Sequence, residues 1–512
     1  MRRTSARRLG ALLWPLVATT ALGASLPDDD LPRVCRDGSW LEEGMRLPRE
    51  VQEYVGRLGA RRFDLRTACA HWAGFASRRR AAFEGVRHVP DENAARLILF
   101  PEPTTNVRRV ASYLAASGEA RQLERTRDYL IATFDSRLTG ARLQEILEGA
   151  AIEYAEPDCE GPDFMATSQE LSTGLRPDCW QRAARPVFPN DPCIDELWGH
   201  SMIGWRPEVA ARSLPRIVAV LDSGIDANHE DLKRNIVKRS LGSLRSQSRI
   251  LNARCATSGR CYSHGTEMAG TIAGRMDNGI GVAGVAPNSL MLPIVISSVD
   301  TRLLARLSTI AQGIEAAADG GADIINISAK WPVDSRAISA AIARAVGGEA
   351  AKQRLVVTGY TSTLRGDDTL REYYPSRYRC LPGVLAAVPT DMRGRNLSNP
   401  GGRPNATDGR IQAPGVDIVV TTTENSERGY TLSEAAGASS AAAYVSGALA
   451  LVWGSPPLNN CDAQQIKELL FCRSKSSDST RYPWINVDFL RELTRVEPGA
   501  HCASAMEALG CI

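Results

Sequence analysis

The second half of the chain alternates short apolar runs with amphipathic stretches. Helical spacing of apolar residues occurs at 303–319 and 335–348. The apolar runs are largely continuous, and they lie at residues 216–222, 322–328, 354–359 and 383–389. Strands that are buried on both faces have this pattern, because neither face meets water. We therefore predict an α/β fold in which a mostly parallel sheet carries helices on both faces.

A shorter and different pattern precedes this region, within residues 94–158. Helical spacing at 105–118 and 139–149 separates three apolar runs, which lie at 96–100, 128–134 and 151–158. Thr139 stands at the start of the second helix and is a suitable N-cap. This strand–helix–strand–helix–strand order predicts a small α+β domain, an open-faced sandwich.

The first residues indicate the compartment. A basic stretch, MRRTSARR, is followed by an apolar stretch that ends in small residues, and the sequence then becomes acidic. This is the pattern of a secretory signal peptide, cleaved between residues 23 and 25. We therefore expect a secreted or periplasmic protein.

The twelve cysteines of an exported chain predict disulfides. One disulfide is expected between Cys255 and Cys261, because it would close a short loop that contains glycine. Cys35 and Cys69 are placed to staple an arginine-rich N-terminal segment that has helical spacing. The predicted divisions are a signal peptide at 1–24, an N-terminal helical extension at 25–93, the small α+β domain at 94–158, a linker at 159–189, the main α/β domain at 190–490 and a C-terminal tail at 491–512.

Composition narrows the class of function. The chain has 512 residues, 43% hydrophobic and 23% charged, which is ordinary for a globular protein of two or three domains. A net charge of +3 does not indicate the basic surface that nucleic-acid binding requires. Neither C-x-x-C nor H-E-x-x-H occurs, so a zinc hydrolase is disfavoured. The apolar run at 441–453 is too short to span a bilayer and predicts a core helix, so no membrane span is expected after signal cleavage.

Three polar residues stand where chemistry is favoured. Asp222 ends an apolar strand and precedes a glycine turn, His264 begins the small-residue stretch HGTEMAGTIAG, and Ser439 precedes an alanine-rich run. Each alone has a simpler interpretation, as a turn-capping aspartate, a core histidine or a helix cap. Together they supply a nucleophile, a base and an orienting carboxylate for acyl transfer.

The segments around these residues resemble the signature segments of the subtilisin-like serine peptidases. They read VAVLDSGIDANHEDL, HGTEMAGTIAG and GASSAAAYVSGALAL, in the family's order of Asp, His and Ser. The resemblance implies a serine endopeptidase in which Ser439 attacks the peptide carbonyl, His264 moves the proton and Asp222 orients the imidazole. It also implies that residues 94–158 are a propeptide that inhibits the enzyme until a cut between Asp158 and Asn190.

The resemblance implies further residues. Asn326, Ser328, Lys330 and Gly359 fall at substrate-binding positions, where an extended peptide would add as a strand. A structural Ca²⁺ ion is implied in a loop of oxygen ligands. Its implied ligands are the side chains of Asp231 and Asn278 and the backbone carbonyls of Met276, Ile280 and Val282.

Two departures from the family pattern affect the expected activity. Lys330 replaces a glycine beside the specificity pocket, where it would narrow the pocket or favour an acidic substrate side chain. Tyr360 falls where the family has the asparagine that donates to the oxyanion, and in subtilisin itself loss of that asparagine costs about 10²–10³ in kcat. The hydroxyl of Tyr360 is one candidate donor, and Thr361 and Ser362 are others. We therefore expect a slow or narrowly specific peptidase.

Two other classes of function stay open at this stage. A catalytically impaired relative that binds peptides or protein partners is the main alternative. An esterase is disfavoured, because no G-x-S-x-G motif surrounds Ser439.

Overall fold

The computed structural model describes most of the chain. The residues it describes are 32–35, 45–73, 95–135, 137–159, 178–237, 263–296, 305–348, 353–364, 370–397, 409–423, 429–433, 437–475, 483–497 and 499–512. The signal peptide and the predicted Cys255–Cys261 disulfide lie outside these residues.

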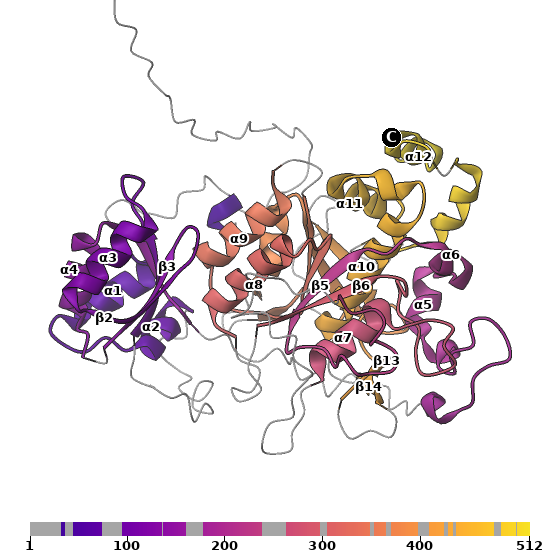
Figure 1. Ribbon diagram of the computed structural model, residues 1–512, viewed down its shortest axis with the longest axis horizontal. Coiled ribbons are helices and arrows are strands. Elements are labelled where there is room, and N and C mark those ends of the chain that lie inside the picture. The colour runs from indigo at the N-terminus through magenta and orange to yellow at the C-terminus, as the bar shows by residue number, and fades with distance from the viewer. Residues whose placement is uncertain are drawn as a thin grey trace, which may run out of the picture.

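The described residues within 45–159 form one folded body, here called the N-terminal unit (Figure 1). Its antiparallel sheet has the order β2-β3-β1-β4, and its strands are β1 (Ala95–Pro101), β2 (Ala120–Arg125), β3 (Leu130–Phe134) and β4 (Ile152–Pro157). Helices α3 (Val107–Ser117) and α4 (Gly140–Gly149) complete the predicted sandwich, and Thr139 caps α4 by accepting from the Arg142 N–H. The sequence pattern missed β2, which is an exposed edge strand with polar side chains.

Residues 45–73 of the N-terminal helical extension belong to the same body. They form α1 (Arg49–Leu58) and α2 (Leu65–Trp72), and Asp64 caps the second helix by accepting from the Thr67 N–H. Both helices pack into the apolar core of the four-stranded sheet. The segments that the sequence separates at residue 93 therefore share one core.

The remaining described residues, from 178 onward, are called the C-terminal unit. Its central sheet has six parallel strands in the order β12-β11-β8-β7-β5-β6, as predicted for an α/β fold. The strands are β5 (Ile217–Asp222), β6 (Leu290–Val295), β7 (Ile324–Ile327), β8 (Leu355–Gly359), β11 (Val384–Thr390) and β12 (Arg410–Pro414). Two antiparallel pairs accompany it: β9 (Ser362–Leu364) with β10 (Leu370–Glu372), and β13 (Ile418–Thr421) with β14 (Tyr430–Ser433).

Helices cover both faces of this sheet. On one face lie α7 (His264–Ala273) and α10 (Gly437–Gly454), which share an apolar core with Val218 and Val220 of β5. On the other face, between the sheet and the N-terminal unit in Figure 1, lie α8 (Leu307–Asp319) and α9 (Arg336–Val346). They pack on Ala219 and Leu221, the alternate residues of β5. Successive strand residues point to opposite faces, so a strand buried on both sides must be apolar throughout.

Shorter elements frame the C-terminal unit. They are the helices α5 (Trp198–Ile203), α6 (Pro207–Arg212), α11 (Ala463–Cys472) and α12 (Cys502–Ala508) and the 3₁₀ helices η4 (Cys179–Gln181), η5 (Ile194–Glu196), η9 (Ser376–Cys380), η10 (Leu458–Asn460) and η11 (Asp488–Arg495). In the described part of the chain, no helix combines the length and apolar character needed to cross a membrane.

Five disulfides join ten of the cysteines. They are Cys35–Cys380, Cys69–Cys159, Cys179–Cys193, Cys461–Cys502 and Cys472–Cys511. The expected staple between Cys35 and Cys69 is wrong, because each pairs with a distant cysteine instead. Spacing along the chain cannot reveal such partners.

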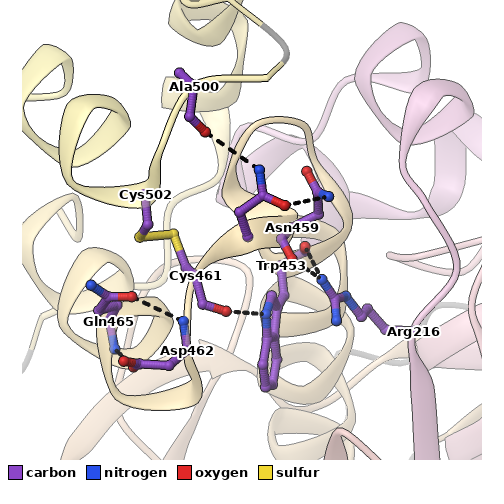
Figure 2. Close-up of a disulfide and its surroundings, with 9 residues drawn as sticks. Arg216, Trp453, Asn459, Cys461, Asp462, Gln465, Ala500 and Cys502 are labelled. Atoms are coloured by element: carbon purple, nitrogen blue, oxygen red, sulfur yellow. Dashed lines mark hydrogen bonds between the residues drawn. A yellow bond between two sulfur atoms is a disulfide. The ribbon is translucent and has the colours of Figure 1, made fainter. Parts of the chain in front are cut away.

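The C-terminal tail is built into the main core. Figure 2 shows Cys461–Cys502 joining α12 to the segment that follows α10. Nearby, the indole N–H of Trp453 donates to the Cys461 carbonyl, and the Arg216 guanidinium donates to the carbonyls of Trp453 and Asn459. Strand β5, which begins beside Arg216, is thus fixed to the far end of α10.

Candidate active site

The topology of the sheet predicts where a site should form. Strand β5 lies between β6 and β7, so the chain leaves β5 toward one neighbour and later returns to the other. Crevices form at such switch points, outside the carboxyl ends of parallel strands. Asp222 is the last residue of β5 and is 1% exposed.

Glycines allow helix α7 to approach this strand end. A Cβ atom on Gly265 would lie 2.2 Å from the Gly224 carbonyl oxygen and 3.1 Å from the Asp222 Cβ. The Gly265 N–H also donates to the Ser223 hydroxyl at 3.1 Å. Only glycine fits here, and the close approach places His264, the first residue of α7, directly beside Asp222.

His264 and Asp222 form a buried hydrogen-bonded pair. The His264 Nδ1 lies 2.8 and 2.9 Å from the two Asp222 carboxylate oxygens. Burial lowers the pKa of His264, but the charge and hydrogen bonds of Asp222 more than offset this, and the pKa is raised to about 9. The other ring nitrogen, Nε2, is buried and has no hydrogen-bond partner among the described residues. An imidazole held at Nδ1 with Nε2 open is arranged as a general base.

Ser439 lies in the first turn of α10 and is 8% exposed. Its carbonyl oxygen lies 3.5 Å from the hydroxyl of Ser328, which follows β7. Strand β7 pairs with β5 so that Ile327 lies opposite Leu221. The next residues, Ser328 and Asp222, therefore lie side by side at the carboxyl ends of these two adjacent strands. Asp222, with His264 beside it, and Ser439 thus lie at one edge of the sheet, although Asp222 and Ser439 are more than two hundred residues apart in the chain.

The N-terminus of α10 is also tightly packed. A Cβ atom on Gly359 would lie 2.6 Å from the Ala438 carbonyl oxygen, so the end of β8 approaches the backbone just before Ser439. A helix N-terminus has free N–H groups and a partial positive charge, which stabilise a negative charge that develops nearby. The Ser439 N–H is therefore suited to an oxyanion.

Comparison with known proteins agrees with this geometry. Residues 216–481, slightly more than half of the chain, match the subtilase family. This chain belongs to the subtilase family of serine peptidases. The family match spans all six strands of the central sheet and all three residues of the candidate triad.

Individual relatives support the assignment. Subtilisin from Bacillus pumilus is 31% identical over 244 residues, which cover 47% of this chain and 77% of that protein. Subtilisin DY from Bacillus licheniformis is 29% identical over 258 residues, covering 49% and 81%. The crystal structure of fervidolysin from Fervidobacterium pennivorans, a keratinolytic enzyme related to subtilisin, has the same fold with a TM-score of 0.55 at 22% identity, covering 79% of this chain and 62% of that one.

The predicted substrate strand contains a structural residue. Asn326 is fully buried, and its amide donates to the Ser328 hydroxyl and accepts from the Ser446 hydroxyl, both at 3.0 Å. It ties β7 to α10 and presents no surface to a substrate. Lys330 is half-buried, and its ammonium group lies 5.5 Å from the centre of the Tyr373 ring.

Tyr360 belongs to a charged cluster that the sequence did not reveal. Its hydroxyl donates to Glu372 at 2.8 Å, and Glu372 also accepts from Arg379 at 2.7 Å. The guanidinium of Arg410 lies 3.5 Å from Glu372 and 5.4 Å from the centre of the Tyr360 ring. Burial raises the pKa of Glu372, but Arg379 more than offsets this and holds it below its usual range. The Tyr360 hydroxyl is therefore engaged with a buried carboxylate.

The implied calcium loop is held by hydrogen bonds. Asp231 is 1% exposed, and it accepts from Asn278 Nδ2 at 2.6 Å, from the Tyr430 hydroxyl at 2.9 Å and from the Val282 N–H at 3.0 Å. The Asn278 amide oxygen, in turn, accepts from the Ile280 N–H. Calcium needs oxygen atoms that face it, whereas here three donors face the carboxylate. The side chains of Asp231 and Asn278 therefore do not fit the ion in this arrangement, and the carbonyls of Met276, Ile280 and Val282 stay ligands that the resemblance alone implies.

Proposed function

We propose that this subtilase is a secreted serine endopeptidase that acts through Asp222, His264 and Ser439. The observation that supports it best is the buried His264, which bonds Asp222 at Nδ1 and has no partner at Nε2 in the described part of the chain. Such an imidazole takes a proton from Ser439 as its oxygen attacks a peptide carbonyl, and returns it to the leaving amine. Water then hydrolyses the acyl-enzyme by the same proton transfers in reverse.

The oxyanion requires donors that are already in place. The Ser439 N–H, in the first turn of α10, is the first donor. The second is open, because the Tyr360 hydroxyl donates to Glu372. Release of Tyr360 from Glu372, or a donor from Thr361 or Ser362, would complete the site.

The N-terminal unit is proposed to be a propeptide, so that the protein is made as a zymogen. Its strand β4 ends on the C-terminal unit, where fully buried Glu156 accepts from the Ser335 hydroxyl at 2.7 Å and from the Arg336 N–H at 2.9 Å. Two residues later, Asp158 accepts from the N–H and hydroxyl of Ser308 at 2.9 and 2.7 Å. These carboxylates satisfy free N–H groups at the starts of α9 and α8. The proposed cut lies beyond them, between residues 158 and 190.

Export is proposed from two features. The first 24 residues have the pattern of a signal peptide. Five disulfides in the described residues also fit an oxidising compartment. Calcium is left out of this proposal, because the Asp231 loop does not fit it.

Active-site labelling tests the proposal directly. A fluorophosphonate should react with wild-type protein and add one label by intact mass, and the mass after reduction of the disulfides also reports whether the chain has been cut. The Ser439→Ala variant should not react. Ser440→Ala is a matched control, because Ser440 is the neighbouring buried serine and its hydroxyl has no partner in the described residues. Labelling of Ser439→Ala would refute the assignment.

The alternative function is that of a catalytically impaired relative that binds peptides or partners. The bond from Tyr360 to Glu372 favours it, because it leaves the second oxyanion donor unassigned. In that case folded wild-type protein would resist the label while Tyr360→Asn would react.

A further inference from the structure

The positions of three disulfides relative to residues 160–177 determine which parts of the chain stay linked after a cut in this segment. Cys69–Cys159 lies wholly before this segment, and it fixes the end of the N-terminal unit to α2. Cys179–Cys193 lies wholly after it, and both cysteines are buried in the core of the C-terminal unit. Only Cys35–Cys380, among the disulfides of the described residues, has one cysteine on each side. A cut anywhere in 160–177 therefore leaves one covalent link across it.

The segment around Cys35 is anchored independently of its sulfur. It forms the short 3₁₀ helix η2 (Arg33–Cys35), which contacts α9 and η9 of the C-terminal unit. Pro32 is buried, and Val34 packs against the same apolar core as α8 and α9. Figure 1 shows η2 in indigo beside α9, apart from the N-terminal unit. The Cα atoms of Cys35 and Cys380 are 6.1 Å apart, within the usual range for a disulfide.

Side chains also hold the N-terminal unit against α9. Arg336 of α9 pairs with Glu153 at 2.8 Å, and its guanidinium lies 4.6 Å from the centre of the Phe100 ring. These contacts add to the buried carboxylates of Glu156 and Asp158. A unit that is docked in this way and tied by one bond would rebind after each separation, because a short tether gives an effective concentration of millimolar order.

We propose that the protein, once cut within residues 160–177, is a two-chain molecule in which the N-terminal unit stays covalently attached through Cys35–Cys380. The proposal rests on the proposed function only for the origin of the cut. Release of the N-terminal unit then requires thiol–disulfide exchange at this one bond, in which an external dithiol is oxidised to its disulfide and the two cysteines become thiols. Cleavage and release are thus separate events.

Exposure favours exchange at Cys35–Cys380 over exchange at Cys179–Cys193. Cys380 is exposed and Cys35 half-buried, whereas Cys179 and Cys193 are fully buried. A reductant must reach the sulfur atoms, so accessible disulfides react first. Low concentrations of dithiothreitol should therefore release the N-terminal unit before they open the core disulfide.

The main test uses full-length Ser439→Ala, which should not cut itself, with a site-specific protease sequence placed inside residues 160–177. After complete cutting, a non-reducing gel should show one band at the mass of the whole chain, and a reducing gel should show two. Two bands without reductant would overturn the proposal. Because this protein lacks the proposed nucleophile, the result does not depend on activity.

Paired cysteine variants identify the bond. Adding Cys35→Ser and Cys380→Ser should give two bands without reductant after the same cut. The matched control, Cys472→Ser with Cys511→Ser, removes a disulfide that lies within the C-terminal unit and should still give one band. One band from the first pair would overturn the proposal, because a different link would then join the chains.

Peptide mapping covers the case in which the variants fail to fold. Alkylated, unreduced wild-type protein should yield a disulfide-linked peptide pair that contains Cys35 and Cys380. A different partner for either cysteine would contradict the proposal. With limiting dithiothreitol, both should be labelled at least about tenfold faster than Cys179 and Cys193, and equal rates would contradict the release step. Failure of the proposed function would appear separately, as wild-type protein that does not react with fluorophosphonate.

Discussion

The two sides of the candidate site are built in different ways. On the base side, Asp222 and His264 meet because the backbone of α7 lies against the turn after β5, with a glycine at the contact. On the oxyanion side, Tyr360 is held by long charged side chains, Glu372, Arg379 and Arg410, which come from three separate segments. The base side has the residues that the sequence resemblance implies, and the oxyanion side has Tyr360 where the resemblance implies an asparagine.

This difference shows which parts of the site depend on the backbone. A backbone contact fixes both the residue type and its position, so a substitution there disturbs the chemistry. A side-chain cluster can exchange one set of partners for another while the strands stay in place. We therefore expect large effects of substitution on the base side and small effects on the other.

The largest effect is expected for Asp222→Asn. Loss of the carboxylate leaves His264 without the partner that fixes its tautomer, and in the serine-peptidase triad this change costs about 10⁴ in kcat. The measurement is kcat on a peptide substrate, with a thermal melt to show that the variant is folded. A loss below about tenfold would mean that His264 is oriented by another group.

A smaller loss is expected for Gly265→Ala. The new Cβ would lie 2.2 Å from the Gly224 carbonyl oxygen, so α7 must shift. A displacement of about 1 Å at a catalytic group can cost about 10² in rate, and the overpacking should lower the free energy of unfolding by about 1–3 kcal/mol. The control is Gly56→Ala in α1, where a Cβ meets open space. Equal activity of the two variants would contradict a backbone-built base side.

The pH profile tests the same side without a mutation. Because the pKa of His264 is raised to about 9, the neutral base forms only as the pH approaches that value. From pH 7 to 9, kcat/KM should rise by about 50-fold. The free energy of unfolding should change in the opposite direction. The contribution of protonated His264 to stability is complete below about pH 6.5 and is lost as the pH rises through about 9. A profile that is flat above pH 7 would show that Asp222 does not raise this pKa.

On the oxyanion side, Tyr360→Phe should change kcat by less than about twofold, because the hydroxyl already donates to Glu372. The same variant should lose about 1.5–3 kcal/mol of stability, the contribution of a hydrogen bond to a charged group. Tyr378→Phe is a control, since that buried hydroxyl bonds Asp334 at 3.1 Å. A loss of about 10²–10³ in kcat for Tyr360→Phe would instead make the hydroxyl the second oxyanion donor.

The smallest effect is expected from chelation. Because Asp231 already accepts three hydrogen bonds from the protein, removing calcium should shift Tm by less than about 1 °C, since an ion that does not bind the native state adds no stability. Melts with and without chelator measure this. A larger shift would show that Tyr430 and Asn278 give way to the ion.

The sequence predicted the centre of the sheet better than its edges. The apolar runs identified four strands, β5, β7, β8 and β11, whereas β6 and β12 at the two edges were not predicted. Pro293 lies within β6, and the short strand β12 carries Gln412. On their outer sides, β6 and β12 have, among the described residues, only isolated bridges, to Ile236 and Trp484, in place of a neighbouring strand. An edge strand tolerates proline and polar residues because it is paired along its whole length on one side only. Its pattern is therefore less distinct than that of a strand buried on both faces.

The site was predictable to a similar extent. Asp222, His264 and Ser439 lie in contiguous motifs, so they can be identified before the fold is known. Glu372 and Arg379 are ordinary charged residues in the sequence, and only their burial around Tyr360 sets them apart. The Cys35–Cys380 pair spans 345 residues, and no spacing rule predicts it.

The caps of α8 have a consequence for the order of folding. The N-cap residue of α8, Arg306, provides no side-chain cap, and the Ser308 N–H is bonded by Asp158, 150 residues earlier in the chain. The first turn is the costly step in forming a helix, because several residues must be fixed for one hydrogen bond. A preformed N-terminal unit offers that first turn a ready acceptor. It would therefore act as a template that shortens the search for a parallel sheet, a topology that otherwise forms slowly.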